Sequence, residues 1–285
     1  MGKYFVLFNP YANNGNGEEL SKGVFQHLQG EETAVINMTE IKSYKELFAG
    51  MQPQDKIVIC GGDGTLNRFV NDCDDRIPDN DIYLFPVGTG NDFMLDLGFK
   101  GTMRPVLINK YITDLPCVFV NDKKYYFIDN VAFGIDGWVC EIADKKKSAN
   151  PEAKINYTTI AISGLLGKYK PCNATVTVDG VTTSYKRVWM APSMNGRFYG
   201  GGMMVTPMQD RLDPDRQITL MMFQNGNRFQ IGVGFPSIFS GKHVNNPNAV
   251  FLKGHEIEVE YDEPRAVQID GETILGVTKY KAVKN

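Results

Sequence analysis

The sequence predicts a protein of two domains, an α/β domain followed by an antiparallel β-sandwich domain. The 285 residues are enough for two domains of ordinary size, each with its own core. Residues 1–112 alternate short apolar runs with segments of helical periodicity, which is typical of βαβ units around a mostly parallel sheet. Residues 113–285 consist mostly of strand signals, and Asp179-Gly180 among them is a strong hairpin-turn signal.

Strand and helix signals alternate through the first domain. The expected strands are residues 3–8, 33–38, 56–60 and 81–86. The expected helices are residues 18–28, 44–48 and 66–70, where apolar side chains recur at helical spacing. Ligands of such sheets bind at the carboxyl ends of the strands. Asn9 and two glycine-rich turns, residues 61–65 and 88–92, fall at these ends and are therefore candidate binding elements.

The second domain is dominated by short strands. The expected strands are residues 116–120, 124–133, 174–178, 185–191, 217–223, 256–261, 266–269 and 277–283. Apolar and polar residues alternate in 175–178 and 256–260, as in strands with one buried face. Helical signals at 137–147 and 155–168 interrupt the strands. This pattern indicates an antiparallel sandwich with a few added helices.

Charge and cysteine usage exclude several protein classes. The formal net charge of -3 gives no general attraction to nucleic acid, so no nucleic-acid partner is expected. No window approaches the roughly 20 apolar residues of a membrane span, and the first residues lack the features of a signal peptide. The five cysteines are an odd number without a C-x-x-C pair, which argues against a disulfide scaffold or a zinc ribbon. We expect a cytoplasmic protein without a transmembrane segment.

The strongest chemical signal is the turn Gly61-Gly62-Asp63-Gly64-Thr65, which lies between a strand and a helix. Glycines let the backbone approach a phosphate closely, and the amides of a helix N-terminus supply positive potential. The carboxylate of Asp63 beside phosphates indicates contact with Mg²⁺, directly or through water. A tight structural turn is the alternative interpretation. The preceding strand and the second glycine turn favour phosphate binding.

The second glycine turn, residues 88–92, also follows a strand. Thr89 can donate its hydroxyl to a phosphate, whereas Asn91 and Asp92 can equally cap the following helix. Phe93 stands where the dinucleotide-binding pattern G-x-G-x-x-G requires a small residue, and the chain contains no P-loop. The two turns therefore predict a nucleotide site that is neither a dinucleotide-binding site of the G-x-G-x-x-G kind nor a P-loop.

Beside these two turns, two further segments become candidate parts of the same site. The polar loop of residues 9–17 can cover a phosphate, although by itself it is typical of a solvated turn. Asp270 and Glu272 flank Gly271, and a plain Asp-Gly turn is the alternative interpretation there. A transfer from ATP needs a base for the acceptor hydroxyl, and none of the three histidines is placed for that role.

Five motifs follow one another along nearly the whole chain: Asn9-Pro10, Gly61-Gly62-Asp63-Gly64-Thr65, Pro86-x-Gly88-Thr89-x-Asn91-Asp92-Phe93, Tyr199-Gly200-Gly201-Gly202 and Asp270-Gly271-Glu272. In this order they resemble the diacylglycerol kinase catalytic-domain family of lipid kinases, which includes bacterial soluble diacylglycerol kinases and sphingosine kinases. The resemblance implies an N-terminal α/β nucleotide-binding domain and a C-terminal antiparallel β-sandwich domain, with the active site between them.

The resemblance also implies a reaction and its residues. The γ-phosphoryl group of ATP would pass, with Mg²⁺, to a lipid hydroxyl, with diacylglycerol the expected acceptor and phosphatidic acid the product. Glu272 would be the general base, with Asp270 and Asp136 in a network of carboxylates, water and Mg²⁺. The residues expected to contact ATP or its metal are Asn9, Thr39, Gly62, Asp63, Gly64, Thr65, Gly88, Thr89 and Asn91. Alanine at Glu272 or Asp63 is expected to abolish most turnover and to leave the fold intact.

A structural Mg²⁺ is the last site that the resemblance implies. It would lie on the acidic loop of residues 210–217. Asp215 is the expected side-chain ligand, with the backbone carbonyls of Leu212 and Gln217.

The chain departs from the family pattern at three places. Arg68 replaces an acidic residue, Asn13 and Asn14 replace a glycine and a basic residue, and Arg216 replaces a glycine. Two alternatives therefore stay open. One is an NAD kinase, which shares Gly-Gly-Asp-Gly-Thr and a two-domain plan; the other is a non-catalytic protein that binds nucleotide or lipid on the same fold.

A lipid substrate requires a peripheral encounter with a membrane surface. Residues 142–171 contain six lysines against Asp144 and Glu152, which gives 6 - 2 = +4, and they also contain several apolar residues. A basic amphipathic helix of this kind suits an anionic membrane at the inner face of the cell. A solvated face over a buried apolar stripe is the alternative. The resemblance also suggests a homodimer.

Overall fold

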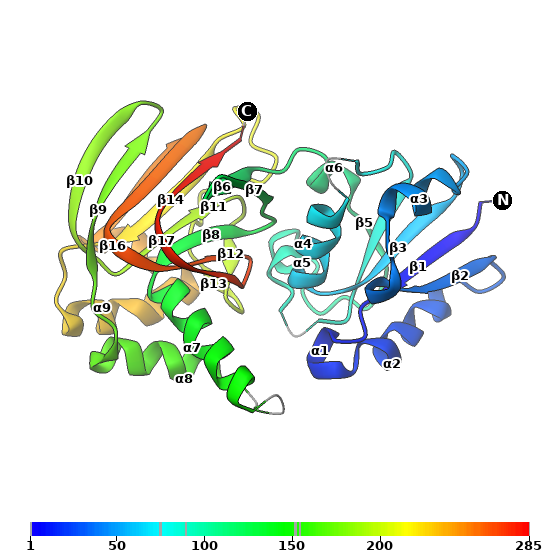
Figure 1. Ribbon diagram of the computed structural model, residues 1–285, viewed down its shortest axis with the longest axis horizontal. Coiled ribbons are helices and arrows are strands. Elements are labelled where there is room, and N and C mark those ends of the chain that lie inside the picture. The colour runs from blue at the N-terminus through cyan, green and yellow to red at the C-terminus, as the bar shows by residue number, and fades with distance from the viewer. Residues whose placement is uncertain (1, 74–75, 89, 151–152, 154, 285) are drawn as a thin grey trace. The chain divides into compact units, whose positions relative to one another are not determined.

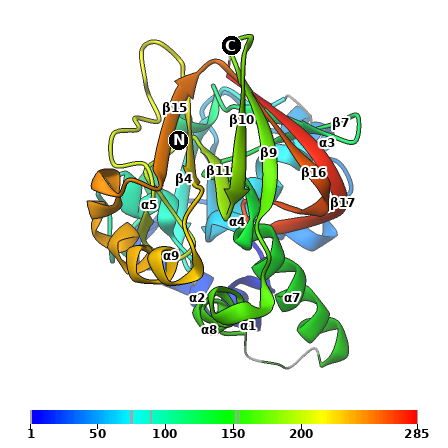
Figure 2. The ribbon, with the colours of Figure 1, turned by 90° about the vertical axis from the view of Figure 1, so that its left-hand side faces the viewer.

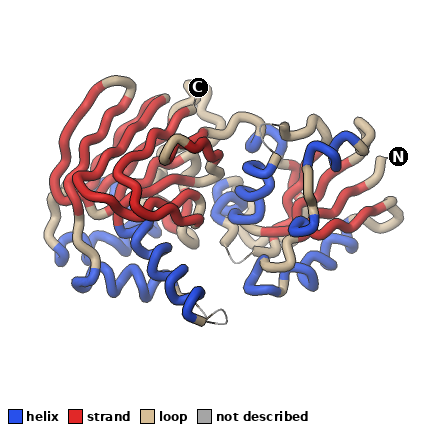
Figure 3. The backbone as a smooth tube through the Cα atoms, viewed as in Figure 1, coloured by secondary structure: helices blue, strands red, loops and turns tan. Residues whose placement is uncertain are grey.

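The computed structural model describes residues 2–73, 76–88, 90–150, 153 and 155–284 (Figure 1). The chain divides into two compact units, Met1–Leu115 and Pro116–Asn285. The first unit is a mixed α/β domain and the second is built mainly of antiparallel strands, as Figure 3 shows by the distribution of helix and strand. The predicted fold class is confirmed in this respect.

The first unit contains one sheet of five strands in the order β2-β1-β3-β4-β5. Their bounds are β1 Tyr4–Phe8, β2 Thr33–Asn37, β3 Lys56–Gly61, β4 Asp81–Pro86 and β5 Val106–Leu107. The first four strands are parallel, and β5 is antiparallel to β4. Residues 57–61 of β3 are all buried, because a central parallel strand is covered on both faces.

Helices cover the two faces of this sheet (Figure 1). They are α1 Ala12–Gly15, α2 Gly17–Ser21, α3 Tyr44–Ala49, α4 Asp63–Asp72, α5 Asp92–Asp96 and α6 Asn109–Ile112, with 3₁₀ turns η1 Lys22–His27 and η2 Met38–Glu40. Val24 of η1 packs with Val6, Val58 and Phe85 of the sheet. The helix expected over 18–28 is therefore α2 continued by a tighter 3₁₀ segment, which keeps its apolar side chains on the core.

The second unit contains a ten-stranded antiparallel sheet in the order β15-β14-β11-β8-β16-β17-β6-β7, and β9 joins it by pairing with β16 and β10. The bounds are β6 Cys117–Val120, β7 Lys123–Tyr126, β8 Asn130–Gly134, β9 Cys172–Val178, β10 Val181–Val188, β11 Met190–Met194, β14 Ile218–Phe223, β15 Ala249–Gly254, β16 Glu256–Ile269 and β17 Glu272–Val283. A separate two-stranded ribbon consists of β12 Phe198–Tyr199 and β13 Met203–Met204. Phe133, Tyr261 and Tyr280 stack within the core that these strands enclose.

Helices lie along one side of the second unit (Figures 1 and 2). They are α7 Ile135–Ala149, α8 Tyr157–Ser163 and α9 Arg228–Gly234, with one π turn, η3 Gly164–Lys168, and two 3₁₀ turns, η4 Phe235–Ser240 and η5 Lys242–Asn245. Helix α7 approaches β16 so closely that a Cβ on Gly137 would lie 2.0 Å from the carbonyl oxygen of Ala266. The start of α7 is thus fixed against the sheet.

Three sequence expectations are corrected in this unit. The strand expected over 124–133 is two strands, β7 and β8, because the intervening backbone amides bind a side chain instead of a neighbouring strand. The strands expected at 256–261 and 266–269 are one strand, β16, with an irregular register between Glu260 and Arg265. Strand β15 and helix α9 were not predicted. Among the residues that the structure describes, no helix has the length and apolar character that crossing a membrane requires.

Candidate functional site

The two glycine turns of the first unit are in direct backbone contact. A Cβ on Gly62 would lie 2.5 Å from the carbonyl oxygen of Gly90 and 3.0 Å from the Cα of Gly88. A Cβ on Gly88 would lie 2.5 Å from the Cα of Gly62. Both positions therefore require glycine for packing alone. Gly64 differs, because a Cβ there would meet no atom within 4 Å, so its backbone at the start of α4 faces open space.

Asp63 links the same two turns through its side chain. Its Oδ2 accepts a hydrogen bond from the amide of Asp92 at 2.7 Å, and its Oδ1 accepts one from Phe93 at 3.2 Å. These amides begin helix α5, where a carboxylate satisfies unpaired donors and the positive helix end. Because the carboxylate caps α5, alanine at Asp63 should cost some stability as well as turnover, and the expectation that this variant keeps the fold stays a prediction.

Other predicted nucleotide contacts gather at the same edge of the sheet. The side-chain amide of Asn9, after β1, donates to the hydroxyl of Thr65 at 3.2 Å. The side-chain amide of Asn91 donates to the carbonyl of Gly88 at 2.8 Å. Its Oδ1 is buried and accepts no hydrogen bond from the described residues. Thr39 follows β2, and its amide and hydroxyl donate to Asn37 at 3.0 and 2.8 Å. Thr89 lies outside the residues that the structure describes.

In the second unit, Asp270 holds the turn between β16 and β17. It has a φ of 45°, and its carboxylate accepts hydrogen bonds from the amides of Ile128, Asp129 and Asn130, the last two at 2.9 and 2.8 Å. Glu272, the first residue of β17, is exposed and pairs with Ile269 across the hairpin. Asp270 thus fixes the turn from which Glu272 projects.

Asp136 is a buried carboxylate in the first turn of α7. Its Oδ1 accepts a hydrogen bond from the Tyr199 hydroxyl at 2.7 Å, whereas Oδ2 is buried and accepts none from the described part of the chain. Burial raises the pKa of Asp136 to about 7, and the bond from Tyr199 partly offsets this rise. A buried carboxylate oxygen without a donor fits a water molecule or a divalent cation.

The pKa of the Cys140 thiol indicates which other carboxylates lie near Asp136. Burial raises the pKa of this thiol to about 12, and the negative charges of Asp136, Asp144 and Glu272 act in the same direction. Asp136 and Glu272 therefore both lie close enough to act on one side chain. Of the three carboxylates expected in one network, Asp270 is held by backbone amides, and Asp136 has an oxygen available.

The acidic loop of residues 210–217 does not fit a bound Mg²⁺. The predicted ligand Asp215 is exposed, and the carbonyl of Gln217 accepts a hydrogen bond from the side chain of Gln209 at 2.9 Å. The buried carboxylate of the loop belongs to Asp213, whose Oδ2 lies 2.7 Å from the ammonium of Lys253. Mg²⁺ needs about six oxygen ligands, and a lysine ammonium at the loop's carboxylate repels a second cation.

The charge of Asp213 is stabilised without a metal ion. Burial acts to raise the pKa of Asp213, but hydrogen bonds from Lys253 and from the amides of Gln217 and Asp215 outweigh it and hold the pKa below its ordinary value. These contacts do not support the expectation of Mg²⁺ at Asp215, Leu212 and Gln217, which stays a prediction. Arg216 has a φ of 52°, in the left-handed region that favours glycine.

The remaining departures also have local explanations. Asn13 and Asn14 have φ values of 49° and 56°, and asparagine tolerates this left-handed conformation better than most residues. Arg68 is an exposed residue of α4 whose Nε lies 3.3 Å from Asp72 Oδ2. None of these substitutions disturbs the packing of the glycine turns.

Two features were missed by sequence reasoning. Arg211, in the acidic loop, is buried and pairs with Asp129, while its other guanidinium nitrogen donates to the carbonyl of Ile128. It thereby joins this loop to the segment that holds Asp270. Tyr199 was known only as part of a glycine motif, and its role as donor to Asp136 follows from the fold. The available sequence signal for Arg211 was its position in the loop of residues 210–217, which also contains four acidic or amide residues.

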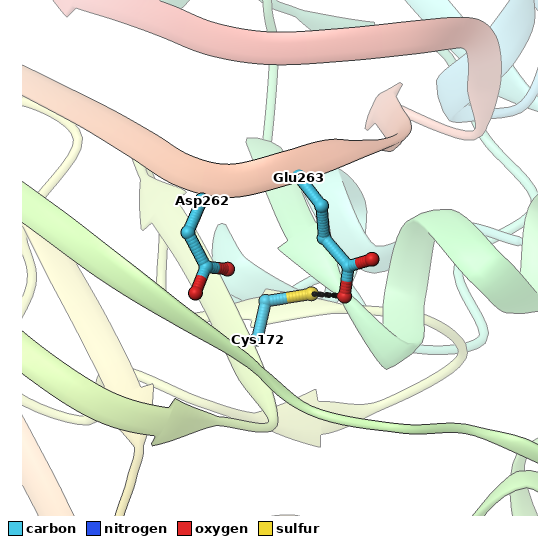
Figure 4. A group of neighbouring side chains, drawn as sticks. All are labelled: Cys172, Asp262 and Glu263. Atoms are coloured by element: carbon cyan, nitrogen blue, oxygen red, sulfur yellow. Dashed lines mark hydrogen bonds between the residues drawn. The ribbon is translucent and has the colours of Figure 1, made fainter.

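A separate group, Cys172, Asp262 and Glu263, has its side-chain ligand atoms within 4.8 Å of one another (Figure 4). The guanidinium of Arg265 contacts this group, because its Nε lies 2.9 Å from Cys172 Sγ and it also pairs with Glu263. Burial raises the pKa of the Cys172 thiol to about 12, whereas a metal ligand would be a thiolate. The group therefore fits a structural ion pair and not a metal site.

Comparison with known proteins agrees with the motif order. The diacylglycerol kinase catalytic domain matches residues 3–113, and the YegS C-terminal NAD kinase beta sandwich-like domain matches residues 129–283. The diacylglycerol kinase of Mycobacterium tuberculosis (strain ATCC 25618 / H37Rv) is 24% identical over 91% of this chain and 85% of its own length. The diacylglycerol kinase of Bacillus subtilis (strain 168) is also 24% identical, over 95% of this chain and 90% of its own length.

Among solved structures, a diacylglycerol kinase from Bacillus anthracis str. Sterne is similar in fold. It has a TM-score of 0.66 and 17% sequence identity, and the match covers 99% of this chain and 94% of that chain. The two family matches together span most of the sequence, and the motifs that carry the resemblance lie at the positions described above. This chain therefore belongs to the diacylglycerol kinase catalytic-domain family.

Proposed function

We propose that this protein is an ATP- and Mg²⁺-dependent lipid kinase that phosphorylates diacylglycerol to phosphatidic acid. The supporting observation is the backbone contact of the two glycine turns at the N-terminus of α4, with the open backbone of Gly64 beside it. Backbone amides at a helix N-terminus favour phosphate, and a glycine without neighbours lets the phosphate approach them. This arrangement supports an anion site built from the main chain.

In this proposal, the first unit binds the nucleotide. Gly62 and Gly88 hold the turns together, Gly64 and Thr65 face the phosphates, and Asn9 orients Thr65 through its hydrogen bond. Thr39, Thr89 and Asn91 are assigned to ATP by family resemblance, and the available Oδ1 of Asn91 is consistent with that role. Asp63 positions α5 rather than serving solely as a metal ligand.

The second unit supplies the proton acceptor. Glu272 takes the proton of the lipid hydroxyl as that oxygen bonds to the γ-phosphorus and the bond from phosphorus to the bridging oxygen of ADP breaks. Asp270 fixes the turn that carries Glu272 through its three amide hydrogen bonds. Asp136 would hold Mg²⁺, or a water molecule bound to it, through its available oxygen. When bound, Mg²⁺ neutralises charge on the phosphates during transfer.

The proposed substrate implies that the reaction takes place at a membrane surface. Diacylglycerol resides in membranes and ATP in the cytoplasm, so the protein would act as a peripheral enzyme at the inner face of a membrane. A homodimer is part of the family expectation and is tested by measuring the mass of the purified protein in solution.

The test is a transfer assay with γ-labelled ATP and Mg²⁺ against a panel of lipid extracts, pure diacylglycerol and NAD. We expect label in phosphatidic acid and none in NADP. Label in NADP alone would support the NAD kinase alternative. Nucleotide or lipid binding without transfer to any acceptor would support the non-catalytic alternative and reject the proposed function.

A further inference from the structure

Five large apolar side chains are exposed on the helical side of the second unit. Their exposed fractions are 49% for Ile162, 81% for Leu166, 78% for Phe229, 66% for Val233 and 47% for Phe239. They come from two segments that are far apart in sequence, one formed by α8 and η3 and the other by α9 and η4. We call these five residues the apolar face. Exposed aromatic and aliphatic side chains that gather on one surface are typical of a docking site.

The buried neighbours of these residues place the apolar face on one side of the unit. Ile160, Leu165, Ile231 and Ile238 belong to a single core cluster. Each exposed residue lies one or two positions from one of them, which on a helix directs its side chain away from that core. Figures 1 and 2 both show α8 and α9 along the same side of the strands.

Arg228 fastens the two parts of the apolar face together. Its guanidinium donates hydrogen bonds to the carbonyls of Gly164, Leu165 and Tyr169, at 3.2, 3.4 and 2.8 Å. It also lies over the ring of Trp189, 5.4 Å from the centroid. Arg228 begins α9, and its partners lie at the two ends of η3. The apolar side chains of both segments are therefore presented on a fixed backbone.

The two stretches of chain that supply the apolar face contain basic residues and no carboxylates. The sequence contains no aspartate or glutamate from 153 to 178 or from 216 to 255, the stretches that supply the apolar face. Lys168, Lys170 and Lys242 are exposed within these stretches. Exposed apolar side chains bordered by lysines are complementary to an anionic membrane surface.

We propose that the apolar face is the surface by which this protein docks on a bilayer that contains anionic phospholipid. Leu166, Phe229 and Val233 enter the boundary between headgroups and acyl chains, and the lysines pair with lipid phosphates. This inference rests on the proposed lipid-kinase function and locates its membrane contact. It assigns the contact to η3, at the end of the basic stretch expected over 142–171, and extends it to α9. At the start of that stretch, Lys145 is already paired with Glu141 at 2.5 Å.

Vesicle flotation of the full-length protein tests the proposal. The vesicles contain phosphatidylcholine alone or with phosphatidylglycerol, at low and high salt. The variants are Leu166→Glu and Phe229→Glu, which change exposed side chains on different segments. Val181→Glu is the matched control, because Val181 is 72% exposed on β10, outside the apolar face. The circular dichroism spectrum and thermal midpoint of each variant establish that it is folded.

We expect the wild-type protein to bind the anionic vesicles and salt to weaken that binding by screening. Each apolar-face variant should bind at least about tenfold more weakly, because a buried Leu or Phe contributes that much or more to partition. Val181→Glu should bind as the wild type does. Equal binding by the three variants and the wild type would overturn the proposal. So would a wild-type dimer that Phe229→Glu dissociates without any loss of vesicle binding.

Activity on two forms of substrate separates this proposal from the proposed function. Phe229→Glu should phosphorylate a short-chain diacylglycerol in solution at the wild-type rate and lose activity only on vesicles. No transfer by the wild type to either form, with vesicle binding lost in the variants, would reject the kinase function and retain the docking surface. Full activity of the variants on vesicles would reject the docking surface and retain the kinase function.

Discussion

The two units build their candidate sites from different parts of the chain. In the first unit the site is made of main chain, where glycines at 62 and 88 let two turns touch and Gly64 leaves a helix N-terminus open. In the second unit it is made of carboxylates, where Asp270 is held by amides and Asp136 is buried with a pKa near 7. Added volume should therefore damage the first site, whereas altered charge should act on the second.

The largest effect is expected at Glu272. Glu272→Gln keeps the size of the exposed side chain and removes its basicity, so kcat should fall by about 10²- to 10⁴-fold. The affinity for ATP, measured by titration, and the thermal midpoint should not change. Glu260→Gln, an exposed change on neighbouring strand β16, is the control. Near wild-type turnover in Glu272→Gln would remove Glu272 from the role of base.

Asp136 should make stability depend on pH. Its pKa in the folded protein, about 7, lies above the ordinary value of 3.8. The folded state therefore holds the proton while the unfolded state loses it, and the protein loses stability as the pH rises from about 4 to about 7. Asp136→Asn keeps an acceptor for Tyr199 and carries no charge.

The asparagine variant should be more stable than the wild type by a margin that grows across this pH range and is constant above it. The margin is on the order of 1.4 kcal/mol for each pKa unit crossed. Urea unfolding at a series of pH values measures it, and the same variant should lose kinase activity. A margin independent of pH would contradict the assigned pKa shift.

A pair of glycine substitutions separates packing from ligand binding in the first unit. Gly62→Ala should lower the free energy of unfolding by about 1–3 kcal/mol, because its Cβ overlaps the second turn. Gly64→Ala, in open space at the start of α4, should not lower stability and should weaken ATP binding. Urea unfolding and ATP titration measure the two effects. The distinction fails if both variants change stability equally.

The smallest effect is expected at the acidic loop. Lys253→Met removes the ammonium from Asp213, and because Lys253 is partly exposed the loss should be about 0.5–1 kcal/mol. A chelator of divalent cations should leave the thermal midpoint of the wild type unchanged. A lower midpoint in the chelator would show that the loop depends on a metal ion.

The sequence by itself determined the order of the strands, turns and motifs along the chain. The apolar run of residues 56–60 and the glycines after it specify a buried parallel strand that ends in a turn. Both the strand and the turn depend only on residues that are neighbours in the sequence. The five motifs were likewise sufficient for the family resemblance, because each is a short local pattern and four of them follow a predicted strand. The antiparallel character of the second unit followed from alternation and from the Asp179-Gly180 turn, which lies between β9 and β10.

The tertiary structure decided what each side chain does. The partners of Asp63 are 29 and 30 residues away, those of Asp270 about 140 residues away, and Tyr199 lies 63 residues from Asp136. No local pattern predicts such contacts, because they arise only when separate elements pack together. Lys253 at the acidic loop and Arg228 beneath the apolar face belong to the same class. Burial and charge balance are properties of the assembled fold, and they distinguish a metal ligand from an ion pair or a helix cap.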